Sequence, residues 1–431
     1  MASSLIMNRE TSTEHQVRAA LLTGGGDRPY VFGLGTSLAS NGAAFDLIGS
    51  DDLDFPELRG NPGVNFLNLR GNQNPNASFV SKISRVLWYY VRLICYAATA
   101  KPRIFHILWN NKFQLFDRTL LMFYYKLLGK RIVFTAHNVN AGIRDSKDGI
   151  LNRLTLRIQY RLSDHLFVHT EKMKLELIEG FGVEASRITV IPFGINNSIP
   201  NTSLTPAEAR KRLGIGESEK VILFFGNITP YKGLEYLVEA FQKKLGRPEE
   251  YRLIIAGVPG NCEKYWSEIK EAIRDDVQSR RILLRADFIP DEEAEIYFKA
   301  ADVLVLPYRH IYQSGVLFTG FNFGLPALVA DVGSLKDDII EGKTGIVFRP
   351  EDSVDLAGAI DRYFASDLFK GLSSHRLGIR DFATERHSWN VVGQMTMSVY
   401  AGLLHMPLPG EPPRRSASTA PLNVKSPSRI D

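Results

Sequence analysis

The sequence has few cysteines and no apolar segment typical of a secretory signal. Its two cysteines, Cys95 and Cys262, lie far apart, and neither stands in a spacing typical of a metal or redox site. A disulfide framework is therefore excluded, and a reducing compartment is favoured over secretion. The N-terminal stretch MASSLIMNRETSTEHQ lacks the apolar core of a signal peptide. We therefore expect a cytoplasmic protein.

Long uninterrupted hydrophobic runs are also missing. In the most hydrophobic helix candidate, residues 79–100, Lys82 and Arg85 precede the apolar run and Arg92 interrupts it. A charge near the centre of a spanning helix costs about 2.5–3.5 kcal/mol on insertion scales, so a transmembrane helix is not expected. The favoured prediction is a helix packed in the core. The alternative is a half-exposed helix at a membrane interface.

Acidic residues are scarce in one region of the first half. Residues 75–131 contain ten basic residues and one acid, Asp117, and residues 1–195 hold 23 Lys and Arg against 16 Asp and Glu. A solvated basic face is the ordinary explanation. Interspersed aromatic residues make an anionic membrane surface a candidate partner. Nucleic acid is not expected, because no recognised binding module accompanies the basic region.

Short apolar strands that alternate with helices are abundant. With 431 residues and 44% hydrophobic composition, the chain suits a globular protein of two domains. The strands predicted in the first half are 19–23, 45–49, 64–69, 103–109, 131–136, 164–169 and 188–192, and the helices are 30–41, 79–100, 113–128, 151–162 and 172–180, the last capped by Gly180. The strands predicted in the second half are 220–225, 252–256, 282–284, 303–306, 327–330 and 344–348, and the helices are 234–241, 292–301, one that opens near Ser314, and 388–404. Such alternation predicts parallel sheets in an α/β protein.

Two strand-to-helix junctions of the second half are candidate phosphate sites. The loop 226–233 places Lys232 at the head of a helix, and the stretch 308–338 opens a helix near Ser314. Free backbone N–H groups and the positive end of the dipole favour an anion at such a position. Each residue also has a simpler explanation, since a surface lysine is usually solvated and a serine often caps its own helix. Two junctions that converge on one crevice favour a ligand, and a nucleoside diphosphate is the hypothesis.

Several segments together resemble the retaining GT-B glycosyltransferases of family four, known as glycosyl transferases group 1. They are FFGNITPYKGLE at 224–235, the strand 302–307, Gly324-Leu325-Pro326 and the run GKTG at 342–345. VIPFGI at 190–195 resembles the segment that closes the first domain of these enzymes, and Ser388-Trp389 resembles the start of their closing helix. The resemblance covers roughly residues 19 to 404. It implies an α/β protein of GT-B fold, with two Rossmann-like domains that face a cleft and a C-terminal helix that returns to the first domain.

The resemblance also divides the chain. We expect a flexible N-terminus over 1–18, an acceptor domain over 19–195, a polar, proline-bearing linker over 196–206 and a nucleotide-sugar donor domain over 207–387. A closing helix follows over 388–405, and the tail 406–431, rich in Pro, Ser and Arg, is expected to be disordered.

Site residues follow from the resemblance position by position. Lys232 would bind the donor diphosphate, together with the loop residues Gly226 and Asn227 and the amides of Ser314, Gly315 and Val316. His137 matches the histidine that contacts the transferred sugar, so His137 and Lys232 are the candidate catalytic residues. Ile289 falls in the loop that meets the nucleobase. Gly25 and Gly26, in a glycine run that a plain tight turn explains equally well, match the loop that approaches the diphosphate.

The chain departs from the family pattern at several positions. Asn227 stands where an arginine is common, and the paired glutamates of the family fall at Ile311 and Thr319. No acid occurs between Asp302 and Asp331. Thr319 would contact ribose more weakly than a glutamate, and Gln313 would supply a polar group. Divergent bacterial members carry the same Gln-Ser-Gly-Val run.

The expected activity is that of a retaining hexosyltransferase. It would move a sugar from a nucleoside-diphosphate-sugar to a saccharide acceptor, lipid-linked, in polysaccharide or glycolipid biosynthesis at the inner face of a membrane. No cofactor or metal is expected, because no carboxylate cluster accompanies the motifs and Lys232 with backbone dipoles would neutralise the leaving group. One alternative is a nucleotide-sugar 2-epimerase, which needs acids that the cleft motifs do not offer. Another is a non-catalytic GT-B protein that binds a nucleotide or a partner.

Overall fold

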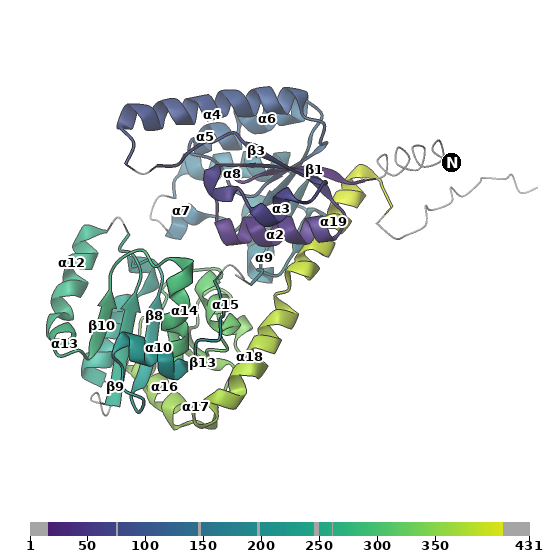
Figure 1. The fold of residues 1–431 in the computed structure, drawn as a ribbon. Helices are drawn as coiled ribbons and strands as arrows, with labels where there is room; N and C mark the ends of the chain where they lie inside the picture. Colours follow the sequence, from purple (N-terminus) through teal and green to yellow (C-terminus); the bar gives the residue numbers. More distant parts are fainter. Residues whose placement is uncertain are drawn as a thin grey trace, which may run out of the picture.

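The chain forms two parallel β-sheets, each covered by helices (Figure 1). The computed structural model describes residues 16–74, 76–144, 148–195, 199–244, 250–260 and 262–407. The first sheet has the order β3-β2-β1-β4-β5-β6-β7, and the second has the order β10-β9-β8-β11-β12-β13. The first-sheet strands are β1 (Arg18–Leu22), β2 (Ala44–Gly49), β3 (Val64–Asn68), β4 (Ile104–Ile107), β5 (Arg131–Thr135), β6 (His165–Val168) and β7 (Ile188–Val190). The second-sheet strands are β8 (Lys220–Phe225), β9 (Tyr251–Ala256), β10 (Ile282–Arg285), β11 (Val303–Leu306), β12 (Ala327–Ala330) and β13 (Gly345–Phe348).

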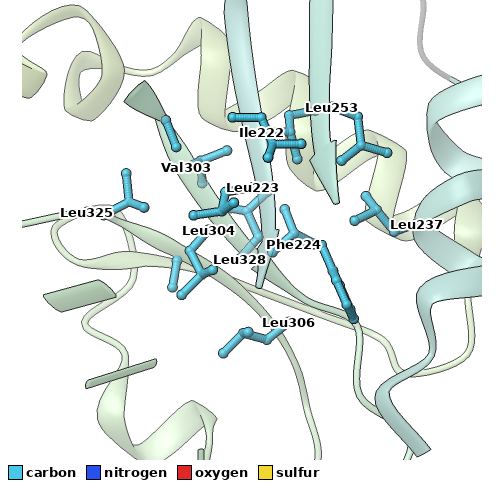
Figure 2. Close-up of a cluster of buried hydrophobic side chains, with 14 of the residues drawn as sticks. Ile222, Leu223, Phe224, Leu237, Leu253, Val303, Leu304, Leu306, Leu325 and Leu328 are labelled. Atoms are coloured by element: carbon cyan, nitrogen blue, oxygen red, sulfur yellow. The ribbon is translucent and has the colours of Figure 1, made fainter. Parts of the chain in front are cut away.

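The apolar strands form because helices cover both faces of each sheet. All four residues of β11 and all four of β12 are buried, as expected for central strands of a parallel sheet. Figure 2 shows Phe224 of β8, Leu304 of β11 and Leu328 of β12 in the resulting core of the second half. The two parallel α/β halves that the sequence predicts are confirmed.

Every helix predicted from periodicity is present, and several others were not predicted. The first half contains α2 (Arg28–Ser40), α3 (Pro56–Arg59), α4 (Phe79–Thr99), α5 (Gln114–Arg118), α6 (Leu120–Leu127), α7 (Ala141–Arg144), α8 (Ile150–Leu162) and α9 (Glu171–Phe181). The second contains α10 (Pro206–Leu213), α11 (Leu234–Glu239), α12 (Glu263–Ala272), α13 (Arg274–Gln278), α14 (Asp291–Ala300), α15 (Gly315–Asn322), α16 (Ser353–Ala365), α17 (Asp367–Lys370), α18 (Leu372–Arg386) and α19 (Trp389–Leu404). Most of the predicted N-terminus and tail, and residues 196–198 of the predicted linker, lie outside the described residues.

Two helix predictions are wrong in detail. The segment 113–128 is two helices, because Thr119 has φ −123° and ψ −90°, which no α-helix accommodates. Helix α9 continues to Phe181 and is capped by Gly182 (φ 68°) rather than by Gly180. A glycine adopts this left-handed conformation without the steric cost of a Cβ.

Helix α4 contacts the core by one face only. Its buried residues include Tyr89, Tyr90 and Leu93, whereas Phe79 and Trp88 are exposed. The favoured prediction of a core-packed helix is therefore wrong for the exposed face, because α4 lies along the outside of the first half and none of the described elements covers that face (Figure 1). None of the helices in the described part of the chain is long and apolar enough to cross a bilayer.

The last helix crosses back to the first half, as predicted. Helix α19 lies against α2, and Tyr400 and Met397 belong to a core cluster of the first sheet. Ser37 of α2 donates a hydrogen bond to the Trp389 carbonyl at 2.6 Å. Trp389 in turn donates from Nε1 to the Ile195 carbonyl at 2.7 Å.

Candidate active site

A cavity of about 730 Å³ lies between the two halves, at the carboxyl ends of their strands. This is where ligands bind in open parallel sheets, and the volume suits a ligand of nucleotide size. The first half contributes residues of the α2 start and the end of its last strand, namely Asp27, Arg28, Pro29, Tyr30, Phe193 and Gly194. The second half contributes residues that follow β8, β10 and β11, and Trp389 lines the cavity from α19.

Lys232 is a buried cation within this cavity. Its side chain is only 6% exposed, and Nζ lies 5.4 Å from the ring centroid of Tyr308. Gly233 (φ 62°) brings the loop close to β11, since a Cβ there would lie 2.0 Å from the Pro307 carbonyl oxygen. Burial lowers the pKa of Lys232, and within the described ranges no carboxylate pairs with it. An unpaired ammonium removed from water is costly, so this arrangement favours an anionic ligand.

The start of α15 faces the same cavity. Ser314 is 3% exposed and has the backbone conformation of an N-cap, but its hydroxyl accepts no hydrogen bond from its own helix. Its Oγ lies 3.3 Å from the Tyr308 hydroxyl instead. The simpler explanation of Ser314 as a side-chain cap is therefore wrong. Leu317 of the first turn donates its amide to the Ser314 carbonyl at 3.1 Å, whereas the amides of Gly315 and Val316 have no acceptor within the helix, and both residues line the cavity.

Seven of the predicted donor residues line the cavity together. They are Asn227, Lys232, Gln313, Ser314, Gly315, Val316 and Thr319. Ile311 also lines it, so both positions of the missing glutamate pair face the ligand space. Thr319 donates its hydroxyl to the Gly315 carbonyl at 3.0 Å, and Gln313 has a buried Oε1 with no hydrogen-bond partner within the described residues.

Other predicted residues stand behind the cavity wall. Gly226 lies directly behind Lys232, because a Cβ on it would be 2.9 Å from Nζ. Ile289 is buried, and its neighbour Phe288, 74% exposed, lines the cavity in its place. Gly25 and Gly26 accommodate side chains of the protein itself. A Cβ on Gly25 would lie 2.6 Å from Arg70, and one on Gly26 would lie 2.0 Å from the Trp109 ring.

His137 packs behind Tyr30, which forms part of the cavity wall. Its ring stacks on Trp109 at 4.0 Å and meets the Tyr30 ring edge-on at 4.6 Å. His137 Nδ1 lies 3.1 Å from His169 Nε2. Burial, reinforced by His169, holds the pKa of His137 well below its ordinary value, so its imidazole is neutral. Contact between His137 and the transferred sugar stays a prediction.

None of the motifs assigned a ligand role to the residues that the first half brings to the cavity. Asp27 caps α2 by accepting a hydrogen bond from the Tyr30 amide at 2.9 Å. Burial raises the pKa of Asp27, and nearby Asp291 adds to the effect. The local signal was an Asp directly before Arg-Pro at a helix start. The cleft thus holds the carboxylates Asp27, Asp291 and Glu292, although no group of three metal-ligating side chains was found in the described part of the chain.

Two family models match the chain, one in each half. The model described as Glycosyltransferase Family 4 matches residues 24–198, and that described as Glycosyl transferases group 1 matches residues 219–366. Among curated relatives, a D-inositol 3-phosphate glycosyltransferase from Corynebacterium urealyticum is 26% identical over 265 residues, 60% of this chain and 61% of that relative. The chain spans 54% to 61% of the length of the first relatives it matches.

Solved structures share the fold at low identity. Sucrose-phosphate synthase from Thermosynechococcus elongatus has a TM-score of 0.72 at 19% identity, with 90% of this chain and 99% of that chain covered. Anabaena HepE in complex with UDP has a TM-score of 0.67 at 14% identity, with 90% and 100% covered. With a glycosyltransferase model matched in each half and both sheets shared with these structures, the chain belongs to the GT-B glycosyltransferases of the group 1 and Family 4 type.

Proposed function

We propose that this protein transfers a hexosyl group from a nucleoside-diphosphate-sugar to a saccharide acceptor, with retention of configuration. The observation that carries the proposal is the buried, unpaired Lys232 across one cavity from the free amides of α15. HepE is described in complex with UDP and with UDP-glucose, which supports a uridine nucleotide as a first donor to test. The exposed Phe288 ring would stack on the base.

The chemistry follows from the charges in the cavity. The bond from the sugar carbon to the diphosphate breaks, a bond from that carbon to the acceptor oxygen forms, and the acceptor proton passes to the departing diphosphate. Lys232 and the amides of Gly315 and Val316 stabilise the charge that develops on the leaving group. We propose that this stabilisation operates without a metal ion, so that a chelator leaves turnover unchanged. Attack and departure on the same sugar face would retain the configuration.

Replacement of Lys232 by alanine tests the assignment. We expect Lys232→Ala to lower turnover by about 10²–10³-fold, because the cation meets the leaving group. Turnover is measured with UDP-glucose and with GDP-mannose, after a thermal-shift screen of nucleoside diphosphates identifies the base that stabilises the fold. Lys336→Ala is the matched control, since Lys336 pairs with Asp331 at 2.9 Å outside the cavity.

Three results would contradict the proposal. Near-normal turnover of Lys232→Ala would remove the residue from the chemistry. Consumption of the donor without any acceptor would indicate a nucleotide-sugar epimerase, for which Asp27 and Asp291 would supply the acids. If no nucleoside diphosphate binds at all, a non-catalytic protein is indicated.

We further propose that the acceptor is lipid-linked and that the first half docks on an anionic membrane. Large apolar side chains are exposed on α4, α5 and α6 and are named here the α4–α6 apolar surface: Phe79, Val80, Ile83, Leu87, Trp88, Val91, Phe113, Leu115, Leu120, Phe123 and Leu127. Helices α4 and α6 are neighbours, since the Tyr124 hydroxyl donates to the Ile94 carbonyl at 3.1 Å. Basic residues flank this surface, and such a combination suits an anionic bilayer better than a neutral one.

A further inference from the structure

Helices α2 and α15 both begin at the cavity, but their N-termini differ. At α15 no side chain caps the helix, and the amides of Gly315 and Val316 have no acceptor within it. At α2 Asp27 fills the cap position, where its Oδ1 accepts a hydrogen bond from the Tyr30 amide at 2.9 Å. A free helix start attracts an anion, whereas one that holds a carboxylate repels it. The diphosphate is therefore favoured at α15, and the α2 side of the cavity is left to another part of the substrates.

Asp27 keeps one carboxylate oxygen available to a ligand. Its Oδ1 is used by the cap, but Oδ2 accepts no hydrogen bond from a described residue, and no described cation forms an ion pair with Asp27. Asp27 is exposed and lines the cavity, so Oδ2 is accessible from the ligand space. The cavity walls nevertheless surround the carboxyl group closely enough that burial raises the pKa of Asp27, and Asp291 of the second half adds to the effect. Asp27 therefore faces the second half across the cavity.

Arg28, the next residue, also lines the cavity and is held in place by the first half. Its Nε donates to the Asp52 carbonyl at 3.0 Å, and its Cζ lies 5.1 Å from the Phe55 ring centroid. Neither Nη1 nor Nη2 donates to a described residue. The first-half wall therefore combines hydrogen-bond donors with an acceptor, and the opposite charges of Arg28 and Asp27 cancel. Such a wall suits a neutral, polar ligand.

We propose that Asp27 and Arg28 bind the acceptor as a neutral pyranoside, with one ring hydroxyl donating to Oδ2 of Asp27 and a neighbouring hydroxyl accepting from Arg28. The inference rests on the proposed function, because it assigns the acceptor side of the same reaction. The cation and the amides proposed to hold the donor diphosphate, those of Lys232 and α15, belong to the second half, which leaves the first-half wall to the acceptor. A carboxylate suits a hydroxyl group there, since hydrogen bonds to charged groups are stronger than those between neutral groups.

Two substitutions remove the charge of Asp27 without removing the cap of α2. In Asp27→Asn the side-chain oxygen still accepts from Tyr30, so the amide nitrogen takes the place of Oδ2. In Asp27→Ser the hydroxyl caps the helix and nothing replaces Oδ2. Asn and Ser cap helices about as well as Asp, so the melting temperature should change little. Asp352→Asn is the matched control, because Asp352 caps α16 by accepting from the Val354 and Asp355 amides and does not line the cavity.

The acceptor probes are octyl glucoside and octyl mannoside, with UDP-glucose or GDP-mannose as the donor. We expect wild-type protein to transfer the sugar to at least one of the two glycosides. Both Asp27 variants should do so with kcat/KM for the acceptor lowered about ten- to a hundredfold, as for the loss of a charged hydrogen bond. UDP affinity, measured by calorimetry, should not fall, because the variants remove a negative charge from the cavity.

Monodeoxy analogues of the better probe separate a direct contact from an indirect effect. Loss of the reacting hydroxyl abolishes transfer, so the comparison uses the other analogues. Wild-type and Asp352→Asn protein should use one of these about tenfold less efficiently than the parent glycoside, or worse, because the site is left with an unpaired oxygen. Asp27→Ser should use that analogue and the parent equally, since the oxygen that the hydroxyl contacts is gone.

Three outcomes would overturn the inference while the donor site stands. They are UDP binding by wild-type protein without transfer to either glycoside, a kcat/KM of both Asp27 variants equal to that of wild type, and equal use of the parent and its analogues by wild type. A loss of affinity for UDP-glucose with unchanged affinity for UDP would assign Asp27 to the transferred sugar and would overturn it as well. Failure of the proposed function is distinguishable, because wild-type protein would then bind no nucleoside diphosphate, and both proposals would fall.

Discussion

Two titratable residues, Asp338 and His387, lie buried beside each other next to α15. Asp338 Oδ1 is 3.7 Å from His387 Nε2 and 3.8 Å from Arg386 Nε, and the His387 ring lies 4.1 Å from the Phe318 ring of α15. Burial raises the pKa of Asp338 to about 7 and lowers the pKa of His387 to about 4. Both groups are therefore neutral near pH 6. Asp338 makes the fold less stable as pH rises, whereas His387 makes it less stable as pH falls.

The change Asp338→Asn should remove one of these two contributions. Between pH 4 and 7 the folded protein holds the Asp338 proton, whereas the unfolded chain, with an ordinary pKa of 3.8, has released it. Asp338 therefore makes the wild type lose stability as pH rises through this window, by at most about 1.4 kcal/mol per pH unit. We expect the free energy of unfolding of Asp338→Asn, relative to wild type, to increase from pH 4 to 7 and then level off in urea titrations.

A second variant checks the sign of this effect. Below pH 6.5 the unfolded chain binds a proton at His387 that the folded protein refuses until about pH 4. His387→Gln should therefore gain stability relative to wild type as pH falls from 6.5 to 4. Asp381→Asn, at an exposed position of α18, is the control. A difference between Asp338→Asn and wild type that does not vary with pH would refute the buried-proton account.

At the scale of the element, one substitution at the start of α15 should affect the stability of the fold and the affinity for UDP in different ways. A Cβ on Gly315 meets nothing closer than Phe193 Cε1 at 3.8 Å, so a side chain fits there. We expect Gly315→Asp to keep or raise stability, because a carboxylate in the first turn gains about 0.3–1 kcal/mol from the helix dipole. The same carboxylate would occupy the position proposed for the diphosphate. UDP affinity, measured by calorimetry, should fall more than about tenfold.

The start of α18 supplies a matched control for this change. Its first turn contains no acid, and Ser373 there is exposed and does not line the cavity. Ser373→Asp should gain a similar stability and leave UDP affinity unchanged. If Gly315→Asp binds UDP as wild type does, the start of α15 is not the diphosphate site.

We expect the protein to bind anionic vesicles through the exposed side of α4. Binding should fall steeply with added salt, since surface charges are screened beyond about 8–10 Å at moderate ionic strength. The double change Leu87→Ser and Trp88→Ser should weaken binding at every salt concentration, because it removes apolar side chains from the docking surface. Leu377→Ser is the control, at an exposed leucine of α18 in the other half. Absent or salt-insensitive binding would exclude this surface as a membrane contact.

Strands buried on both faces were easier to predict from the sequence than the orientation of half-exposed helices. Strands such as β11 and β12 were predicted residue by residue, because burial on both faces leaves a continuous apolar run between turns. In α6 the same kind of reasoning failed. The spacing of Leu120, Phe123, Tyr124 and Leu127 predicts an apolar stripe. Tyr124 is half-buried, but the other three side chains are exposed while Leu121 and Tyr125 are buried. Periodicity identifies an apolar face, but it does not say whether that face contacts the core.

The cavity residues also divide into those that the sequence could predict and those that it could not. Lys232, Ser314 and Thr319 were predictable because short motifs fix them relative to a strand end. Phe288 and Trp389 reach the cavity only through the tertiary fold, and no local pattern marks them as ligand contacts. Gly25 belongs to a motif but does not line the cavity. The space that its missing side chain leaves is filled by Arg70, a residue forty-five positions away in the chain.

At the scale of the whole molecule, Trp389 occupies the junction of the two halves. Its ring lies 5.1 Å from the Tyr30 ring centroid, and a Cβ on Gly33 or Gly194 would come within 2.1 or 2.2 Å of it. The two glycines belong to α2 and to the segment that leaves the first sheet. The indole therefore fixes how α19, the first half and the crossing segment meet, at the edge of the cavity.

Replacing this indole should disturb transfer more than donor binding. Trp389→Phe loses the hydrogen bond to the Ile195 carbonyl, at a cost of about 1 kcal/mol in the free energy of unfolding. UDP affinity should change little, because Lys232 and α15 both belong to the second half. Turnover should fall about tenfold or more, since transfer requires the acceptor side to stand within bond-forming distance of the donor, and a displacement of about 1 Å can cost about 10²-fold. Trp266→Phe on α12, away from the cavity, is the control. Equal losses in UDP affinity and turnover would make Trp389 a direct donor contact. Unchanged turnover would show that the halves are held together without it.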